Sequence, residues 1–204
     1  MYTPDAFAET DLDRLHSLIE AYDFAMLITN REPTATVSHL PFVLDREIGP
    51  YGTLQAHMAR SNPHWQSFTG EALVVFRGPH SYISPTWYEP DAPAVPTWNY
   101  AVVEAYGTPR IVDDAQQLRA QQERLVATHE AGRSPSWTMA DQPPAYIDAM
   151  LRGIVAFEIP IARLEGKFKL NQNRSTTDRQ HVAQALATGG SEDGQALARL
   201  MSAN

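Results

Sequence analysis

The run FAMLIT at residues 24–29 is the first of six apolar segments that decide the fold of this chain. The others are residues 35–44 (ATVSHLPFVL), 53–58 (TLQAHM), 72–76 (ALVVF), 82–84 (YIS) and 98–106 (WNYAVVEAY). Each is bounded by Gly, Pro or polar turns, so the series predicts about six strands before residue 110. No helical pattern separates successive pairs. This dense spacing favours an antiparallel barrel over a doubly wound sheet.

Two helical patterns flank these strands. Residues 11–22 place Leu and Ile side chains at helical spacing and predict an amphipathic helix. Residues 114–130 predict a polar helix, with Asp113 as its cap, Gln116 as the return partner of a capping box and Gly132 as its stop.

The rest of the chain is a connection, a strand and a tail. Residues 133–144 are Ser/Pro-rich, and residues 153–161 predict one more strand. The tail divides at Gly189–Gly190 into two short helices. We therefore expect one domain over residues 1–175, with flanking and inserted helices, and a helical extension over residues 176–204.

The composition is that of a globular core, with 204 residues of which 43% are hydrophobic and 20% charged. The formal net charge of -8 disfavours DNA as a partner, because gripping phosphate backbones takes a clustered Lys/Arg surface. The sequence shows no signal-like start and no membrane-length apolar stretch, so we expect a cytoplasmic protein without a membrane partner. With no cysteine, thiolate metal sites are excluded, and redox chemistry would need a bound cofactor.

The first segment with chemical character is His57-Met-Ala-Arg60-Ser61-Asn62-Pro-His64-Trp65. It follows a strand and opens a short helix at Pro63, so a cation, neutral donors and unpaired backbone N–H groups would lie together. Such a group can hold a phosphate. The alternative is that Asn62 only caps the helix while Arg60 pairs with a surface carboxylate.

Two further segments, residues 78–88 and 95–100, set aromatic side chains beside hydroxyl and amide groups. This composition suits the wall of a flat heteroaromatic ligand whose edges the polar groups would bond. Aromatic residues on strands also serve as core, and the pattern by itself leaves both interpretations open.

Residues 165–174 contain the densest positive patch of an otherwise acidic chain. In an extended segment, one face would carry Lys167, Lys169, Asn171 and Asn173, and the other Phe168, Leu170 and Gln172. The patch would bind an anion or form salt bridges with acidic helix faces.

Four histidines, His39, His57, His64 and His80, lie in the strand region. No zinc motif is present, and no nearby acidic residue completes a facial triad in the sequence, so we predict no metal site.

Together these segments resemble the PaiB family of FMN-binding regulators, which have the split-barrel fold of pyridoxamine-phosphate-oxidase-like and flavin reductase-like proteins. The matching motifs, in chain order, are Met1-Tyr-Thr-Pro, His57-x-x-Arg60-x-Asn62-Pro-His64-Trp65, Gly78-Pro-His80-x-Tyr82-Ile-Ser84-Pro-x-Trp87-Tyr88, Pro96-Thr-Trp98-Asn99-Tyr100 and Gly166-Lys-Phe-Lys169-Leu-x-Gln172-Asn173-Arg174. Five motifs in order with compatible spacing cover nearly the whole chain.

The resemblance implies a mainly β fold with flanking helices, a six-stranded antiparallel split β-barrel that forms a homodimer with FMN in the cleft between protomers. It also suggests roles for individual residues. The phosphate would be held by Arg60 with His57 and Ser61 or Asn62, the ring or ribityl chain by Trp98 and Asn99, and further polar contacts would come from Lys169 and Gln172, with His39 as an additional candidate. No catalytic residue is assigned.

Three functions are compatible with this assignment. The first is a flavin-dependent oxidoreductase, which would use NAD(P)H or a small-molecule substrate. Such an enzyme needs few catalytic side chains, because the flavin itself performs the hydride and electron transfer. The second is a flavin-sensing transcriptional regulator that acts through a protein partner or DNA without catalysis. The third is a haem-binding split-barrel protein, in which one histidine would present a free imidazole to iron.

Overall fold

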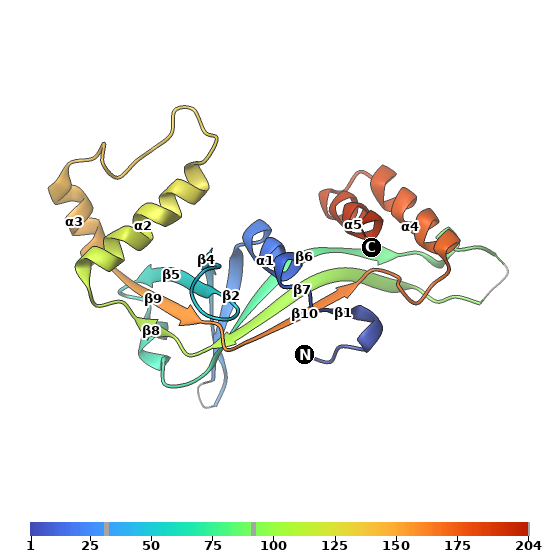
Figure 1. Cartoon of the computed structure of the whole chain (residues 1–204), viewed down its shortest axis with the longest axis horizontal. Coiled ribbons are helices and arrows are strands. Elements are labelled where there is room, and N and C mark those ends of the chain that lie inside the picture. Colours follow the sequence, from blue (N-terminus) through green and yellow to red (C-terminus); the bar gives the residue numbers. More distant parts are fainter. Residues whose placement is uncertain (31–32, 91–92, 204) are drawn as a thin grey trace. The chain divides into compact units, whose positions relative to one another are not determined.

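The structure is a computed structural model that describes residues 1–30, 33–90 and 93–203. These residues form two compact units, each built from separate stretches of the chain (Figure 1). Unit 1 comprises residues 1–18, 77–104 and 165 onward, and unit 2 comprises residues 19–76 and 105–164. Three strands contribute residues to both units, namely β6 (Ala72–Ile83), β7 (Thr97–Gly107) and β10 (Arg163–Lys169).

Unit 1 contains the strand order β1-β10-β7-β6, with β1 at Ala8–Glu9. Strand β1 pairs antiparallel with β10, and Ala8 lies opposite Lys167. The helices of this unit are α1 (Leu12–Ala21, which extends into unit 2), α4 (Thr176–Thr188) and α5 (Glu192–Ser202), together with the 3-10 turns η1 (Asp5–Phe7) and η3 (Pro85–Trp87).

Helix α1 packs closely against the strands of unit 1. Its start is capped by Asp11, whose Oδ1 accepts a hydrogen bond from the Arg14 backbone N–H at 3.1 Å. A Cβ atom at Gly166 of β10 would lie only 2.2 Å from the Leu15 Cδ2 atom. The strand therefore needs glycine at this position to let the buried leucine face of the helix approach its backbone.

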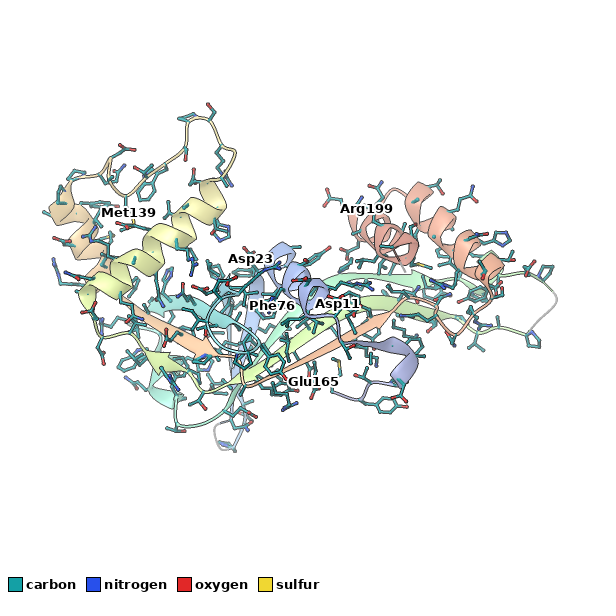
Figure 2. The ribbon with its side chains drawn as sticks, in the orientation of Figure 1. Asp11, Asp23, Phe76, Met139, Glu165 and Arg199 are labelled. Carbon is teal, nitrogen blue, oxygen red and sulfur yellow. The ribbon has the colours of Figure 1, made fainter. Side chains whose placement is uncertain are left out.

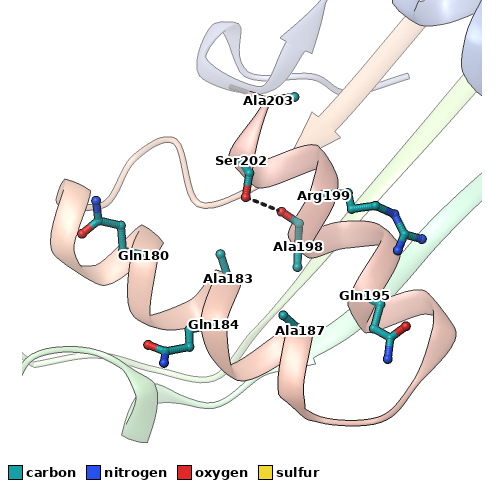
Figure 3. A pocket seen from close by; sticks show the side chains of 9 residues that line it. All are labelled: Gln180, Ala183, Gln184, Ala187, Gln195, Ala198, Arg199, Ser202 and Ala203. Atoms are coloured by element: carbon teal, nitrogen blue, oxygen red, sulfur yellow. Dashed lines mark hydrogen bonds between the residues drawn. The ribbon is translucent and has the colours of Figure 1, made fainter.

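Helices α4 and α5 form a hairpin, which confirms the predicted division of the tail. Gly190 separates them with a φ of 79°, and the hydroxyls of Ser175 and Ser191 cap their starts. Val182 and Leu197 are fully buried on the inner side. The other side is an open groove of about 830 Å³ between the two helices, lined by alanines and polar side chains (Figure 3).

Unit 2 contains the strand order β6-β2-β3 and the sheet β4-β5-β9-β8. Its strands are β2 (Phe24–Thr29), β3 (Thr36–Pro41), β4 (Val43–Asp45), β5 (Thr53–Ala59), β8 (Arg110–Ile111) and β9 (Ile154–Pro160). Helices α2 (Ala115–Glu130) and α3 (Pro144–Arg152) and the 3-10 turn η2 (Pro63–Ser67) complete it.

Aromatic rings form the centre of the unit 2 core. Phe42 lies 5.8 Å from Phe76 and 6.3 Å from Phe157, measured between ring centroids, and Phe157 lies 5.0 Å from Phe68. Phe76 is labelled in Figure 2. All these pairs have the edge-to-face geometry that aromatic rings prefer. Phe42, Phe76 and Phe157 come from predicted strand segments, and Phe68 follows η2.

The structure corrects four details of the expected elements. Residues 35–44 form two strands, because the chain passes at Phe42 from β3, which pairs with β2, to β4, which pairs with β5 in the other sheet. Residues 72–76 and 82–84 belong to one continuous strand, β6. Helix α2 is capped by Asp114, whose carboxylate accepts from the Gln117 N–H, and not by Asp113. Helix α3 begins at Pro144, the last residue of the segment expected to be a Ser/Pro-rich connection.

The predicted fold class is confirmed at the level of a mainly β protein with flanking helices. One sheet has six strands, in the order β1-β10-β7-β6-β2-β3, and every described strand register is antiparallel. Among the described residues, no helix combines the length and the apolar character required to cross a bilayer.

Candidate functional site

The strongest candidate for an anion site is the turn at residues 59–62, here called the Arg60 turn. It leaves β5 and is closed by a hydrogen bond from the Asn62 N–H to the Ala59 carbonyl at 2.9 Å. Two further bonds hold its backbone: the Arg60 N–H donates to the Gly153 carbonyl at 2.8 Å, and the Trp65 indole N–H donates to the Arg60 carbonyl at 3.2 Å. The turn is therefore fixed to the start of β9 and to η2.

The Arg60 side chain is held in one orientation although it is exposed. Its Nε donates to the Arg152 carbonyl at 2.9 Å, and its Nη2 donates to the Ile154 carbonyl at 2.7 Å. Because both acceptors are neutral carbonyls, the positive charge of the guanidinium is not cancelled by a carboxylate. The Nη1 atom has no hydrogen-bond partner among the described residues, so the outer edge of the guanidinium stays available.

The two residues after Arg60 play different parts. Ser61 is exposed, and its hydroxyl makes no hydrogen bond within the described residues. Asn62 is used structurally: its Oδ1 accepts from the His64 N–H at 3.0 Å, and its Nδ2 donates to the Ser38 hydroxyl at 3.2 Å. The capping role considered for Asn62 is present, while Arg60 bonds backbone carbonyls where a surface carboxylate was the alternative.

The two histidine candidates of unit 2, His57 and His39, differ in how far they are buried. His57, on β5, is half-buried, its Nδ1 atom has no hydrogen-bond partner among the described residues, and burial lowers the pKa of this side chain. His39, on β3, is exposed and follows Ser38, so the two side chains point to opposite faces of the strand. Ser38 rather than His39 is the β3 residue that contacts the Arg60 turn.

A hollow of about 560 Å³ adjoins the Arg60 side chain. Residues of α2 and α3 line it, including Arg119 and Asp148, which form an ion pair at 2.5 Å. Arg152 also lines it, and its guanidinium forms no hydrogen bond or ion pair with the described residues.

Unit 1 presents an aromatic surface formed by His80, Tyr82 and Trp98, here called the Trp98 cluster. The Trp98 ring stacks on His80 at a centroid distance of 6.2 Å and meets Tyr82 edge-on at 6.1 Å. Trp98 is 52% exposed and Tyr82 45% exposed, so these rings are not core residues. Their exposure favours the ligand-wall interpretation of the two aromatic segments.

Lys169 lies beside this cluster. Its ammonium donates to the Trp98 carbonyl at 2.8 Å and to the Thr97 hydroxyl. Burial lowers the pKa of Lys169, and the nearby charge of Lys167 lowers it further. Two of the predicted site residues, Trp98 and Lys169, are thus brought together.

Asn99 and Gln172 are less accessible than the sequence suggested. Asn99 is fully buried, its Nδ2 lies 3.7 Å from the Met201 sulfur of α5, and its Oδ1 has no hydrogen-bond partner among the described residues. Gln172 folds back on its own loop, where its Oε1 accepts from the Leu170 N–H at 2.7 Å and its Nε2 donates to the Phe168 carbonyl. The amide of Gln172 is therefore occupied in shaping the loop.

The expected alternation along residues 165–174 ends with β10. Asn171 adopts a left-handed φ of 62° and is buried, and its Nδ2 donates to the Tyr88 hydroxyl at 3.0 Å. The Arg174 guanidinium lies 4.5 Å from the centre of the Tyr88 ring. Tyr88 and Asn171 belong to this arrangement although no site role was predicted for them.

Within the residues that the structure describes, no group of three or more His, Asp or Glu side chains could hold a metal ion.

Comparisons with known proteins agree with the cofactor expected from the sequence. The family described as "Putative FMN-binding domain" matches residues 1–163. The "Protease synthase and sporulation protein PAI 2" of Bacillus subtilis is 29% identical over 98% of this chain and 96% of its own length. A protein of Emericella nidulans, AN0679, is 32% identical over 98% of this chain and 96% of its own length.

Solved structures with low sequence identity share the fold. The flavocytochrome Anf3 of Azotobacter vinelandii has a TM-score of 0.61 and 12% identity, over 79% of this chain and 69% of that one. The FAD and haem binding protein of Mycobacterium smegmatis has a TM-score of 0.59 and 15% identity, over 85% of this chain and 78% of that one. From the family match and the near full-length relatives, the chain belongs to the FMN-binding domain family of PaiB-type proteins, whose cofactor is FMN.

Proposed function

We propose that this protein binds FMN as a homodimer of split-barrel protomers and that the Arg60 turn of unit 2 holds the phosphate. The Trp98 cluster of unit 1 is a separate candidate for contact with the isoalloxazine ring. The observation that carries the proposal is the fixed, exposed guanidinium of Arg60. Its Nε and one Nη2 hydrogen hold backbone carbonyls, which leaves the Nη1–Nη2 edge as a fork for two phosphate oxygens. The free hydroxyl of Ser61 adds a neutral donor at the same turn.

Residues of unit 1 are separate candidates for contacts with the other parts of FMN. The exposed faces of the Trp98 cluster supply an aromatic surface for the isoalloxazine. The Lys169 ammonium uses two of its three hydrogens on Thr97 and Trp98, and the third can bond a polar ring edge. Bound FMN supplies hydride and electron transfer, and the chain itself supplies the binding, the orientation and the local charge.

The homodimer follows from the resemblance, which implies that FMN lies in the cleft between protomers. Under this arrangement the partner protomer provides part of the site, and Lys169 is a candidate for a contact across the dimer. An interface that completes a cofactor site is of the obligate type, and such interfaces commonly bury more than about 2,000 Å² in total.

The proposed activity is that of a flavin-dependent oxidoreductase that accepts electrons from NAD(P)H. A second candidate is a cytoplasmic flavin-sensing regulator. It is favoured by the near full-length similarity to a protein whose name places it in sporulation and protease synthesis.

Light scattering and a turnover assay test this proposal together. We expect a dimer at micromolar concentration in the presence of FMN and oxidation of NAD(P)H by the flavin-loaded protein. A stable monomer that still holds flavin would contradict the shared site. A flavin-loaded dimer that oxidises no nicotinamide and binds a promoter fragment in a salt-sensitive way would instead assign the regulator.

A further inference from the structure

His64 is a buried histidine that the proposed site does not use, yet it contacts that site. It lies in η2, directly after the Arg60 turn, and is 1% exposed. Its Nδ1 lies 2.7 Å from the Ser38 hydroxyl of β3, and its Nε2 lies 2.9 Å from the Thr29 hydroxyl of β2. The imidazole therefore bridges two neighbouring strands by hydrogen bonds at both nitrogens.

The same histidine is joined to the last residue of the Arg60 turn. Asn62 accepts from the His64 backbone N–H and donates to the Ser38 hydroxyl that His64 also contacts. Four groups thus share one network, in which the ring fixes Ser38 and Ser38 fixes Asn62. A change in the ring would be transmitted to the turn through these bonds.

The hydrogen count of this network favours a neutral ring. With a neutral imidazole, the Ser38 hydroxyl accepts from Asn62 and donates to Nδ1, while Nε2–H donates to Thr29, so every group is satisfied. A doubly protonated ring would make Ser38 accept twice and turn its own hydrogen away.

No described contact supplies a charge to stabilise a protonated ring. The groups that face it are the Thr29 hydroxyl from β2, the Ser38 hydroxyl from β3 and, within the segment that follows, the Phe68 ring at 5.9 Å. The charged side chain on the adjoining turn is Arg60, which is itself a cation. Burial lowers the pKa of His64, in agreement with this geometry.

We propose that His64 is a positioning residue that holds the Arg60 turn in its phosphate-binding geometry, and that it does so only as a neutral imidazole. The inference rests on the proposed function, because it assumes that the phosphate of FMN binds at this turn. Its consequence is that acidification weakens the preference for a phosphorylated flavin over riboflavin.

The experiment measures the affinities of FMN, riboflavin and riboflavin 5′-sulfate by fluorescence titration between pH 7.5 and pH 5. The sulfate ester is included because it keeps its charge over this range, whereas a phosphate monoester titrates near pH 6. We compare the wild type with His64→Gln and His64→Leu. The matched control is His181→Gln, which changes an exposed histidine on α4 of unit 1.

In the wild type we expect the preference for the sulfate ester over riboflavin to fall as the pH drops through a midpoint below 6.5, the unperturbed histidine value. At pH 7.5, His64→Leu should lower this preference about fivefold, which corresponds to one net hydrogen bond of about 1 kcal/mol. His64→Gln should retain part of it and lose the pH dependence. His181→Gln should follow the wild type.

A preference in the wild type that does not change with pH would overturn the proposal, and so would an equal loss of riboflavin and sulfate ester in His64→Leu. If the leucine variant does not fold, the proposal is tested by the pH dependence of the sulfate-ester preference in the wild type and in His64→Gln. A wild type that binds no flavin at pH 7.5 would instead refute the proposed function, and a wild type that binds all three ligands equally would refute the phosphate assignment to the Arg60 turn.

Discussion

Replacing Arg60 by alanine is expected to weaken FMN binding by roughly 10- to 150-fold while changing riboflavin binding much less. The reason is that only FMN carries the phosphate that the outer edge of the guanidinium can grip, and charge-assisted hydrogen bonds contribute about 1.5–3 kcal/mol. The measurement is a pair of fluorescence titrations of the same protein preparation, one with each ligand.

Two further variants make this result specific. Arg60→Lys keeps the charge but cannot bond the Arg152 and Ile154 carbonyls with the same planar edge, so it should restore only part of the FMN affinity. Arg199→Ala removes an exposed guanidinium from α5 and should leave both affinities unchanged. Equal losses of FMN and riboflavin in Arg60→Ala would show that Arg60 only ties β5 to β9.

Replacing Trp98 by alanine is expected to weaken FMN and riboflavin alike, by about 10-fold. The indole is half exposed and already stacked on His80, so it offers a preformed face for a flat ring, and aromatic pairs contribute up to about 1.5 kcal/mol beyond their buried area. Isothermal titration with both ligands measures the loss.

The loss caused by Trp98→Ala should not depend on the phosphate, in contrast to Arg60→Ala. Trp98→Phe should recover part of the affinity because a ring remains. Trp137→Ala, which removes an exposed tryptophan from unit 2, is the matched control. Unchanged flavin affinity in Trp98→Ala would remove the Trp98 cluster from the site.

The elements that could be predicted are those set by local pattern. Residues 24–29 form β2 with the predicted bounds, because five apolar residues followed by the β-branched Thr29 lie between polar neighbours. The Asn62-Pro63 sequence likewise predicted a capped helical turn, since a side-chain cap and a proline at the first position act over a few residues only.

The features that could not be predicted depend on contacts distant in the sequence. At Phe42 the chain passes from β3 in one sheet to β4 in the other, and Asn99 is buried against Met201 of α5, about a hundred residues later in the chain. The left-handed Asn171 ends the alternation expected for residues 165–174. The periodicity of the sequence does not indicate which residues make these contacts.

The candidate site likewise contains residues that the local sequence pattern identified and residues that depend on contacts distant in the sequence. Arg60 and Ser61 were identified because they occupy one turn between a strand and a capped segment. Ser38 and His64 were not predicted as site residues, because the contact between them arises only when β3 lies beside η2. The motif quoted for the resemblance already contained His64 two positions after Asn62, and that spacing was the available signal.

The visible absorption spectrum of the purified protein, read together with the identity of any chromophore released on denaturation, is the decisive test of FMN binding. We expect a flavin spectrum, from bound cofactor or after addition of FMN, with FMN as the released chromophore. A Soret band with no flavin absorption would assign haem in its place, and a colourless protein that takes up no added FMN would refute FMN binding.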